Sequence, residues 1–343
     1  MRHELFIAQD GGVMTTDADT PLALVGASDS ARTARAALAD ACARRGPVLL
    51  IAEAGCRAED VVEALHSRTR AGRPLVWVDC GASDPADIDV RLFGAVAPRA
   101  GAHDLETIGS DAAILDASDG TLVLDNIDGL PASSQRRLAR VLRDGEVRVP
   151  GAALPCVAGF RLVGATARDL DEEANEGRFR EDLLRRFAAR ITVPPLRQRS
   201  QDIPEIVERL ARDAGREAMT FTSAAINVLA ALPWTRNVDE LGAVLGRILA
   251  GMATAVPDAV RQEDVLLNLP IPGGFARPDL TASLREARRR FEREYIAAVL
   301  ERHQWRMSDA ARTLGIERAN LYRKTRQLGI ARATRGELAA VTR

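Results

Sequence analysis

The sequence predicts an α/β fold: a mostly parallel sheet with helices on both faces, followed by a helical region and a small helical domain at the carboxy terminus. Three observations support this. Between residues 22 and 200, short apolar runs closed by Gly, Asp or Thr alternate with longer runs of helical periodicity. Strand signals stop near residue 201. A segment rich in Pro and Gly then precedes an arginine-rich helical pattern that starts at 281.

The strands expected in the α/β region are short and rich in β-branched residues. They are PVLLIAEAG (47–55), RPLVWVDCG (73–81), GTLVLDNID (120–128) and FRLVGATARD (160–169). Helices are expected between them, with apolar residues at helical spacing, in ARTARAALADACARR (31–45), AEDVVEALHSRTR (58–70) and ASSQRRLARVLRDG (132–145). The alternation is typical of a parallel sheet.

Helical patterns dominate the next part of the chain, in DIPEIVERLARDAG (202–215), TSAAINVLAALPW (222–234) and NVDELGAVLGRILAGMA (237–253). They predict a helical lid subdomain. The chain is therefore divided into a short tail over 1–21, an α/β subdomain over 22–200, a lid over 201–269, a linker over 270–280 and a helical domain over 281–343.

Composition indicates a globular chain. With 343 residues and 46% hydrophobic content, it can bury the cores of two or three ordinary domains. No apolar run has the length of a membrane span and the amino terminus lacks the order of a signal peptide, so we expect a cytoplasmic protein with no membrane partner. The cysteines lack CxxC spacing, so neither a metal site nor a disulfide framework is expected.

Charge is divided unevenly along the chain. The net charge is −1, but residues 284–343 hold 15 Arg or Lys against 7 Asp or Glu, which leaves about −9 for the rest. The single lysine, Lys324, lies in this basic end. No lysine is therefore available to a phosphate-binding loop elsewhere.

The segment MSDAARTLGIERANLYRKTRQLGI (307–330) has the spacing of a helix-turn-helix. A first helix is expected from Ser308, as N-cap, to Leu314, then a turn at Gly315, then a second helix over about 317–328. The second helix directs basic side chains outward, where they can contact base edges or phosphates in a major groove. The residues expected to bind double-stranded DNA are Ser308, Arg318, Asn320, Tyr322, Arg323, Lys324 and Arg326.

The helix expected before this motif, SLREARRRFEREYIAAVLERH (283–303), has an apolar face. The face includes Leu284, Phe291, Tyr295, Ala298 and Val299. It is either internal core or a dimer seam. We favour the seam, because helix-turn-helix proteins commonly pair to span two half-sites.

Residues 22–330 resemble the central AAA+ domain and Fis-type helix-turn-helix of NtrC-like bacterial enhancer-binding proteins, the activators of sigma-54 RNA polymerase. The motifs that carry the resemblance are RLFG (91–94), DGTLVLDNIDGLPASSQRRLARVLRDGEVRVPG (119–151), RLVGATARDL (161–170), GRFREDLLRRF (177–187), PPLRQRSQDIPEI (194–206), PWTRNVDEL (233–241) and AARTLGI with LYRK (310–324). They follow the family's order and cover about nine-tenths of the chain.

The resemblance also identifies a nucleotide site whose functional residues are changed. LLIAEAGCRAEDVVEALH (49–66) begins like a phosphate-binding loop, with Gly55 retained. Ala58 occupies the position of the family's phosphate-contacting lysine, and Arg57 the position of a glycine. Arg57 can still attract an anion, but its side chain would crowd the loop.

The hydrolytic positions differ as well. The family's Asp-Glu pair after a strand is Asp125-Asn126 here, so magnesium could keep its carboxylate while the general base is lost. The family's sensor asparagine is replaced by Ala167, and a phosphate-facing arginine by Asp239. Arg180 and Arg186 match the family's trans-acting arginine fingers; without a substrate we expect them to serve as salt bridges between subunits.

The family's loop that contacts the sigma factor, Gly-Ala-Phe-Thr-Gly-Ala, is replaced by APRAGA (97–102). Arg99 and Ala100 stand where the resemblance implies a phenylalanine and a threonine. The aromatic tip is missing.

These losses predict a sigma-54-independent transcription regulator rather than an enzyme, with no cofactor and no metal. Its partners would be double-stranded DNA, further copies of itself as a dimer or higher oligomer, and RNA polymerase or another regulator. The central domain would serve for oligomerisation, ligand sensing or partner docking. Two alternatives stay open: a noncanonical ATPase that remodels sigma-54 polymerase with Arg57 in place of lysine, and an antagonist that inserts Arg180 and Arg186 into rings of an intact paralogue.

Overall fold

The chain forms two compact units, residues 1–267 and 268–343. The structure, a computed structural model, describes residues 20–81, 84–96, 104–251 and 259–269, and in the second unit residues 286, 289, 292–293, 296–297, 299–300, 307–314, 316 and 318–330. The expected tail over 1–21 lies almost wholly outside these residues, and the linker over 270–280 entirely so.

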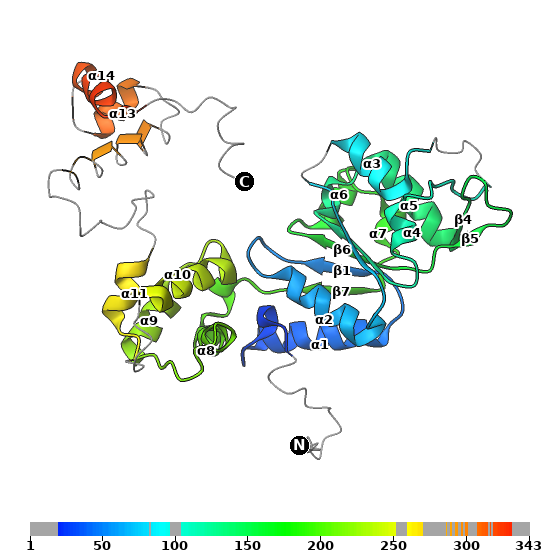
Figure 1. The fold of residues 1–343 in the computed structure, drawn as a ribbon, viewed down its shortest axis with the longest axis horizontal. Coiled ribbons are helices and arrows are strands. Elements are labelled where there is room, and N and C mark those ends of the chain that lie inside the picture. The colour runs from blue at the N-terminus through cyan, green and yellow to red at the C-terminus, as the bar shows by residue number, and fades with distance from the viewer. Residues whose placement is uncertain are drawn as a thin grey trace, which may run out of the picture. The chain divides into compact units, whose positions relative to one another are not determined.

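A five-stranded parallel sheet forms the centre of the larger unit (Figure 1). Across the sheet the order is β2 (Leu75–Asp79), β3 (Thr121–Asp125), β6 (Arg161–Thr166), β1 (Val48–Ile51) and β7 (Ala189–Thr192). Val48 of β1 lies opposite Val163 on β6 and Ala189 on β7. Because β1 has a neighbour on each side, the loop that follows it leaves from the interior of the sheet's carboxyl edge.

The two faces of the sheet bury separate cores, because successive strand residues point to opposite sides. Leu49, Leu122 and Leu162 belong to the core under α3 (Pro85–Phe93), α4 (Ala113–Asp116) and α5 (Ala132–Asp144). Val48, Leu50 and Val163 belong to the core under α1 (Asp29–Ala43) and α2 (Ala58–Arg70). Figure 1 shows these helix groups on opposite sides of the sheet, which confirms the expected layers.

All four expected strands and three expected helices of this subdomain are present. The sequence did not predict β7, whose buried residues are only Ala189 and Ile191. It also missed a hairpin of β4 (Glu146–Val147) and β5 (Cys156–Val157), because strands of two residues carry too little pattern. The remaining helices are α6 (Leu170–Asn175) and α7 (Glu181–Leu184).

The lid contains α8 (Ile203–Asp213), α9 (Ser223–Ala231), α10 (Asn237–Gly251) and α11 (Gln262–Asn268). The Thr222 hydroxyl caps α9 by accepting from the Ala225 amide at 3.2 Å. Trp234 is buried, and its Nε1 donates to the Leu229 carbonyl at 2.7 Å. The three helices expected from the sequence in this region are confirmed.

In the small unit, α13 (Met307–Thr313) and α14 (Arg318–Gln327) flank a turn, as the sequence predicted. Their core contains Ala310, Ala311 and Leu321, joined by Ile296, Val299 and Leu300 of the preceding segment. Val299 is thus part of this chain's own core, which corrects its assignment to a dimer seam. The other residues of that expected seam lie outside the described residues.

Ser308 is the second described residue of α13 and exposed, so it is not the N-cap that the sequence suggested. Within the described parts of the chain, no helix combines the length and apolar character needed to cross a bilayer. Over the same residues, no group of three or more His, Cys, Asp or Glu side chains is arranged to hold a metal ion.

Candidate functional sites

The loop between β1 and α2 is held against the lid. The Ala52 amide donates to the Thr166 carbonyl at 2.9 Å, which fixes the start of the loop on β6. Farther along, the Asp239 amide of α10 donates to the Gly55 carbonyl at 3.1 Å, and Asn237 Nδ2 donates to the Ala54 carbonyl at 3.0 Å. Two loop carbonyls therefore accept hydrogen bonds from the first turn of a lid helix.

Gly55 makes this approach possible. It has φ +76°, and a Cβ added there would lie 2.1 Å from the carbonyl oxygen of Arg236. Only glycine combines this backbone conformation with so close a contact. Beside it, Nη1 and Nη2 of Arg197 donate to the two carboxylate oxygens of Glu53, at 2.6 and 2.5 Å. Hydrogen bonding from Arg197 holds the pKa of Glu53 below its ordinary value.

Arg57 has a left-handed backbone conformation, which is common for glycine and uncommon for other residues. Its φ of 59° lies in the left-handed region, where a non-glycine residue carries a cost on the order of 1 kcal/mol. Its Nε and Nη2 donate to the two carboxylate oxygens of Asp60 at 2.8 and 3.0 Å. That pairing raises the pKa of Arg57, with Glu59 and Asp239 adding to the effect. Ala58 follows as the first residue of α2.

At the carboxyl ends of β2 and β3, Asp79 and Asp125 lie around the amide of Asn126. Asn126 Nδ2 donates to Asp79 Oδ1 at 3.0 Å, and the Asn126 backbone amide donates to Asp125 Oδ1 at 3.0 Å. Burial raises the pKa of Asp125, and the charges of Asp79 and Asp128 raise it further. A carboxylate at position 126 would face Asp79 in place of a donor.

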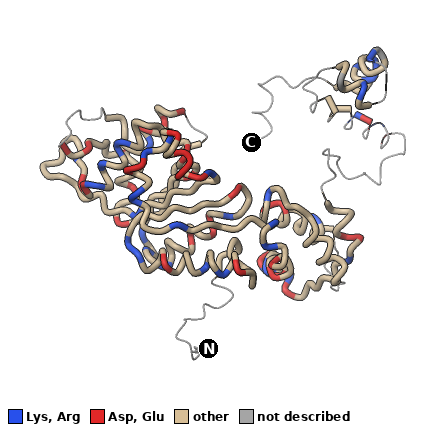
Figure 2. The backbone as a smooth tube through the Cα atoms, turned by 180° about the vertical axis from the view of Figure 1, so that it is seen from behind, with Lys and Arg blue, Asp and Glu red and all other residues tan. Residues whose placement is uncertain are grey.

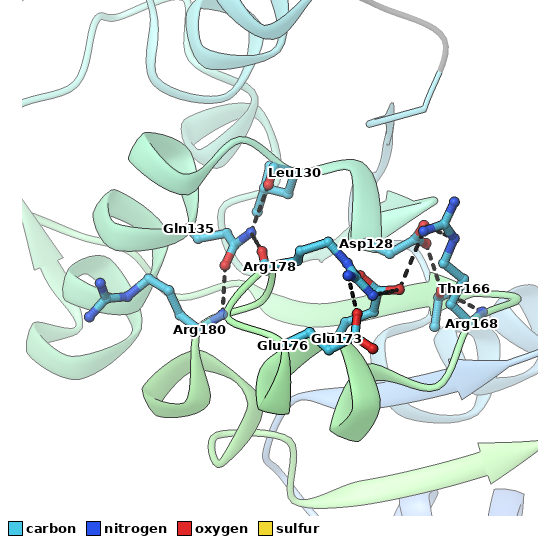
Figure 3. Close-up of polar contacts among 9 residues, drawn as sticks. All are labelled: Asp128, Leu130, Gln135, Thr166, Arg168, Glu173, Glu176, Arg178 and Arg180. Atoms are coloured by element: carbon cyan, nitrogen blue, oxygen red, sulfur yellow. Dashed lines mark hydrogen bonds and ion pairs between the residues drawn. The ribbon is translucent and has the colours of Figure 1, made fainter.

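Asp128 contacts Thr166, the last residue of β6, and Arg168, which follows the strand (Figure 3). Thr166 Oγ1 donates to Asp128 Oδ1 at 2.6 Å, and Arg168 Nε lies 3.2 Å from Asp128 Oδ2. Arg168 also reaches Glu173, which Arg178 pairs with from the other side. Ala167, the position of the family's sensor asparagine, is exposed between Thr166 and Arg168.

Arg180 and Arg186 are both engaged within the chain. The Arg180 guanidinium donates to both oxygens of Asp182, at 2.9 and 2.7 Å, and its backbone amide donates to Gln135 Oε1 at 2.8 Å. In Figure 3 its guanidinium points away from the ion-pair group around Glu173. Arg186 is half-buried, and its Nη1 donates to the Leu142 carbonyl at 3.4 Å. Arg180 thus pairs within the chain, and a salt bridge of either arginine with another subunit stays a prediction.

Residues 93 and 109 flank the segment that the resemblance aligns with the family's sigma-contacting loop; its residues 97–102 lie outside the described residues. The Gly109 amide donates to the Phe93 carbonyl at 2.7 Å. Buried Arg137 of α5 pairs with Asp89 of α3 at 2.6 Å and with Glu106, which precedes Gly109, at 2.7 Å. Its guanidinium also lies 4.1 Å from the centre of the Phe93 ring.

On α14 four of the residues expected to contact DNA share an outward face. Arg318, Tyr322 and Arg326 recur every four residues and are exposed, with Arg323 beside them. The Arg318 guanidinium lies 5.9 Å from the Tyr322 ring centre, and Arg323 Nη2 donates to Asn320 Oδ1 at 3.0 Å. These side chains remain predictions as DNA contacts, and the helix places them together.

Lys324 differs from the outward orientation expected of it. Its Nζ pairs with Glu292 of the preceding segment, and its side chain is 38% exposed. Because Thr325 next to it is buried, this part of α14 turns toward the core of the small unit. Lys324 therefore has an internal partner for its charge.

Sequence reasoning did not identify Asn237, which is fully buried and joins three parts of the site. Its Oδ1 accepts from the Leu196 amide at 2.9 Å while its Nδ2 binds the loop at Ala54. The pairs Glu53–Arg197 and Arg57–Asp60 were missed for different reasons. The first joins residues distant in sequence, whereas the second has the i, i+3 spacing of helix ion pairs and could have been found.

Comparison with known proteins places these sites in a family. Residues 24–192 match the sigma-54 interaction domain, and residues 287–328 match the Fis family of bacterial regulatory proteins. The chain is 31% identical over 323 residues to the nitrogen assimilation regulatory protein NtrX of Azorhizobium caulinodans, covering 90% of this chain and 70% of that protein. It is 34% identical over 288 residues to the Nif-specific regulatory protein of Azotobacter vinelandii, covering 78% of this chain and 52% of that protein.

A solved structure agrees with this relationship. The crystal structure of NtrX from Brucella abortus in complex with ADP has a TM-score of 0.60 and 28% identity, covering 91% of this chain and 70% of that one. The chain thus spans from about half to 70% of the length of these relatives. The expected fold class, an AAA+ α/β domain with helical lid and Fis-type helix-turn-helix, is confirmed. The chain belongs to the NtrC-like family of bacterial enhancer-binding proteins, which are transcription regulators.

Proposed function

We propose that the chain is a sequence-specific DNA-binding transcription regulator that acts without sigma-54 and whose AAA+ domain does not hydrolyse ATP. The central domain then serves as an oligomerisation platform, a ligand-sensing body or a docking surface. One observation carries the proposal. Arg57, the only cation within the loop after β1, forms an ion pair with Asp60, and Ala58 occupies the position of the family's lysine.

The charges around this loop favour the proposal. A triphosphate is held in such loops by backbone amides and a lysine ammonium. Here the loop carbonyls of Ala54 and Gly55 are bound by the lid, and Asp239 reaches the loop where the family has a cation. A γ-phosphate would meet this carboxylate where the resemblance implies a cation. The residues present fit a magnesium-bound triphosphate poorly.

The hydrolytic residues support the same conclusion. A general base must accept a proton at neutral pH, and the Asn126 amide instead donates a hydrogen bond to Asp79. Arg180, which would stabilise a transition state in a neighbouring subunit, is paired with Asp182. These contacts weigh against both alternatives, since one needs Arg57 to bind phosphate and the other needs Arg180 free for an intact paralogue.

DNA binding is supported independently of the nucleotide site. The Fis-family match covers the helix-turn-helix, and α14 presents Arg318, Tyr322, Arg323 and Arg326 on one exposed face. Guanidinium forks in this arrangement suit guanine edges and phosphates. The segment that replaces the sigma-contacting loop lacks the aromatic tip, which supports regulation that does not depend on sigma-54.

The first experiment measures nucleotide directly, because relatives with solved structures were crystallised with ADP and with ATP. Calorimetry of the full chain with magnesium-ATP and a phosphate-release assay should both give no signal above buffer. Asp125→Ala serves as the matched variant. Micromolar ATP binding together with phosphate release that Asp125→Ala abolishes would overturn the proposal.

The second experiment tests the regulatory half. Bound DNA is mapped across the genome for the full chain and for Arg326→Ala, with RNA levels measured after deletion of the gene. Discrete sites that the variant loses, and RNA changes that persist when sigma-54 is deleted, are expected. Loss of every regulated response in the sigma-54 deletion strain would support the polymerase-remodelling alternative instead.

A further inference from the structure

A cavity rich in arginine lies at the end of the α/β subdomain away from the loop after β1. Its volume is about 720 Å³. The lining includes the carboxyl ends of α1 and α2 and residues at or before the starts of β2, β3 and β6. In a parallel sheet these positions mark the amino-terminal edge of the strands, whereas the loop after β1 leaves from the opposite edge.

Six of the lining residues are arginines, and one is acidic. The arginines are Arg44, Arg45, Arg68, Arg70, Arg73 and Arg161, and the acid is Asp119. In Figure 2, basic segments concentrate where α1 and α2 end. Such a concentration of one sign in a concave surface raises the local concentration of oppositely charged ligands.

Arg70 and Arg161 donate to carbonyl oxygens, so these hydrogen bonds leave the charges of the two arginines in place. Arg70 Nη1 donates to the Gly159 carbonyl at 3.0 Å, and Arg161 Nη2 donates to the carbonyls of Ala41 and Arg44 at 2.5 and 2.9 Å. A carbonyl satisfies a donor without cancelling its charge. Arg44 pairs with Asp40 at 2.8 Å, outside the cavity lining.

Arg161 is the one buried arginine among the residues that line the cavity. It is 4% exposed, and its Nε has no hydrogen-bond partner. Burial lowers the pKa of Arg161, and the charge of Arg70 lowers it further. A buried donor without a partner destabilises the folded state. An anion in the cavity would offset the repulsion among these cations.

We propose that this cavity binds a small molecule that carries two or more phosphate groups. Guanidinium forks bind phosphate oxygens in pairs, and several of them suit a ligand with more than one phosphate. The volume lies in the range of small-molecule sites, and a concave site with a buried arginine suits a compact ligand better than a DNA backbone. Such a site would give the proposed ligand-sensing role a chemical class of ligand. Binding itself does not depend on the proposed function; only its role in regulation does.

Titration calorimetry of the full chain tests this, with tripolyphosphate as the probe, inorganic phosphate for comparison and EDTA to remove metal ions. The test variant is Arg45→Glu with Arg73→Glu, at two exposed cavity positions. The matched control is Arg32→Glu with Arg212→Glu, two exposed arginines outside the lining with the same change in charge. Thermal melting checks that both variants fold.

Tripolyphosphate should bind with one site per chain and more tightly than phosphate. The cavity variant should lose at least about tenfold in affinity, and the control less than about threefold. Absence of tripolyphosphate binding to the folded chain would overturn the proposal, and so would equal losses in both variants. Binding of nonspecific duplex DNA that the cavity variant abolishes, without tripolyphosphate binding, would assign the cavity to DNA instead.

Alkylation of Cys42, which lines the cavity and is half-buried, locates the ligand. Cys156→Ser removes the other partly exposed thiol, while burial raises the pKa of Cys56 to about 11 and of Cys80 to about 12, so both react slowly. Tripolyphosphate should slow Cys42 alkylation several-fold; an unchanged rate at saturation would refute binding at this cavity. Neither tripolyphosphate binding nor Cys42 alkylation depends on DNA or on ATP turnover. Failure of these two tests therefore leaves the proposed function standing, and failure of the proposed function leaves the cavity proposal standing.

Discussion

Replacing Gly55 with alanine tests the contact between the loop after β1 and the lid. The added Cβ would lie 2.1 Å from the Arg236 carbonyl oxygen and 2.9 Å from its carbonyl carbon, so the loop or the start of α10 must move. The left-handed conformation costs alanine about 1 kcal/mol. Overpacking against a backbone adds about 1–3 kcal/mol. We therefore expect the free energy of unfolding to fall by about 2–4 kcal/mol.

Gly145→Ala is the matched control, because Gly145 has φ +69° and nothing lies within 4 Å of an added Cβ. It should cost about 1 kcal/mol, from the backbone alone. Urea denaturation followed by tryptophan fluorescence measures both, with buried Trp234 reporting on the lid. If the two variants lose stability equally, within about 0.5 kcal/mol, then the steric contact with the lid carries no energy and the reasoning is refuted.

Three further predictions concern single side chains. Asp202 is buried and accepts from the backbone amide and hydroxyl of Ser28, at 2.8 and 2.5 Å, so Asp202→Ala should lower unfolding free energy by about 3 kcal/mol; a loss below about 1 kcal/mol in urea denaturation would contradict this. Burial raises the pKa of Asp125 in the folded state, so its ionisation opposes folding at neutral pH and this penalty disappears as the pH falls through that pKa. Asp125→Asn should therefore raise the melting temperature at pH 7 and give no gain near pH 3.5, whereas a gain of equal size at both would show that charge is not the cause. Arg326→Ala should weaken specific DNA binding about tenfold in a fluorescence-anisotropy titration, and Lys324→Ala, whose charge Glu292 already pairs, by less; the reverse order would sink the assigned face of α14.

The sequence predicted elements whose signals are local. The strand at 48–51 and the helix at 58–70 follow from apolar runs and helical spacing, and the exposed face of α14 follows from period alone. β7 was missed because an edge strand with two buried residues leaves a weak pattern. The corrections for Lys324 and Val299 involve interactions across the fold, such as the pairing of Lys324 with Glu292.

The candidate sites divide in the same way. The differences of Arg57 and Ala58 from the family's nucleotide loop could be predicted from the sequence because the family motif is contiguous, and their effect on nucleotide binding stays a prediction. The arginine cavity could not, since Arg44, Arg70 and Arg161 come from three separate segments that only the sheet topology brings to one edge. The contact of Asn237 with Ala54 likewise depends on the packing of the lid.

The contacts that Phe93, Gly109 and Arg137 make at the two ends of the segment 94–108 have an evolutionary consequence. Since one buried guanidinium and one amide fix both ends where the chain leaves and rejoins the domain, the intervening stretch can change length and composition while the domain keeps its fold. We therefore expect that one recognition sequence can be replaced by another during evolution without further changes in the rest of the domain. Grafting a paralogue's tip between these anchors is correspondingly a promising route to altered partner choice.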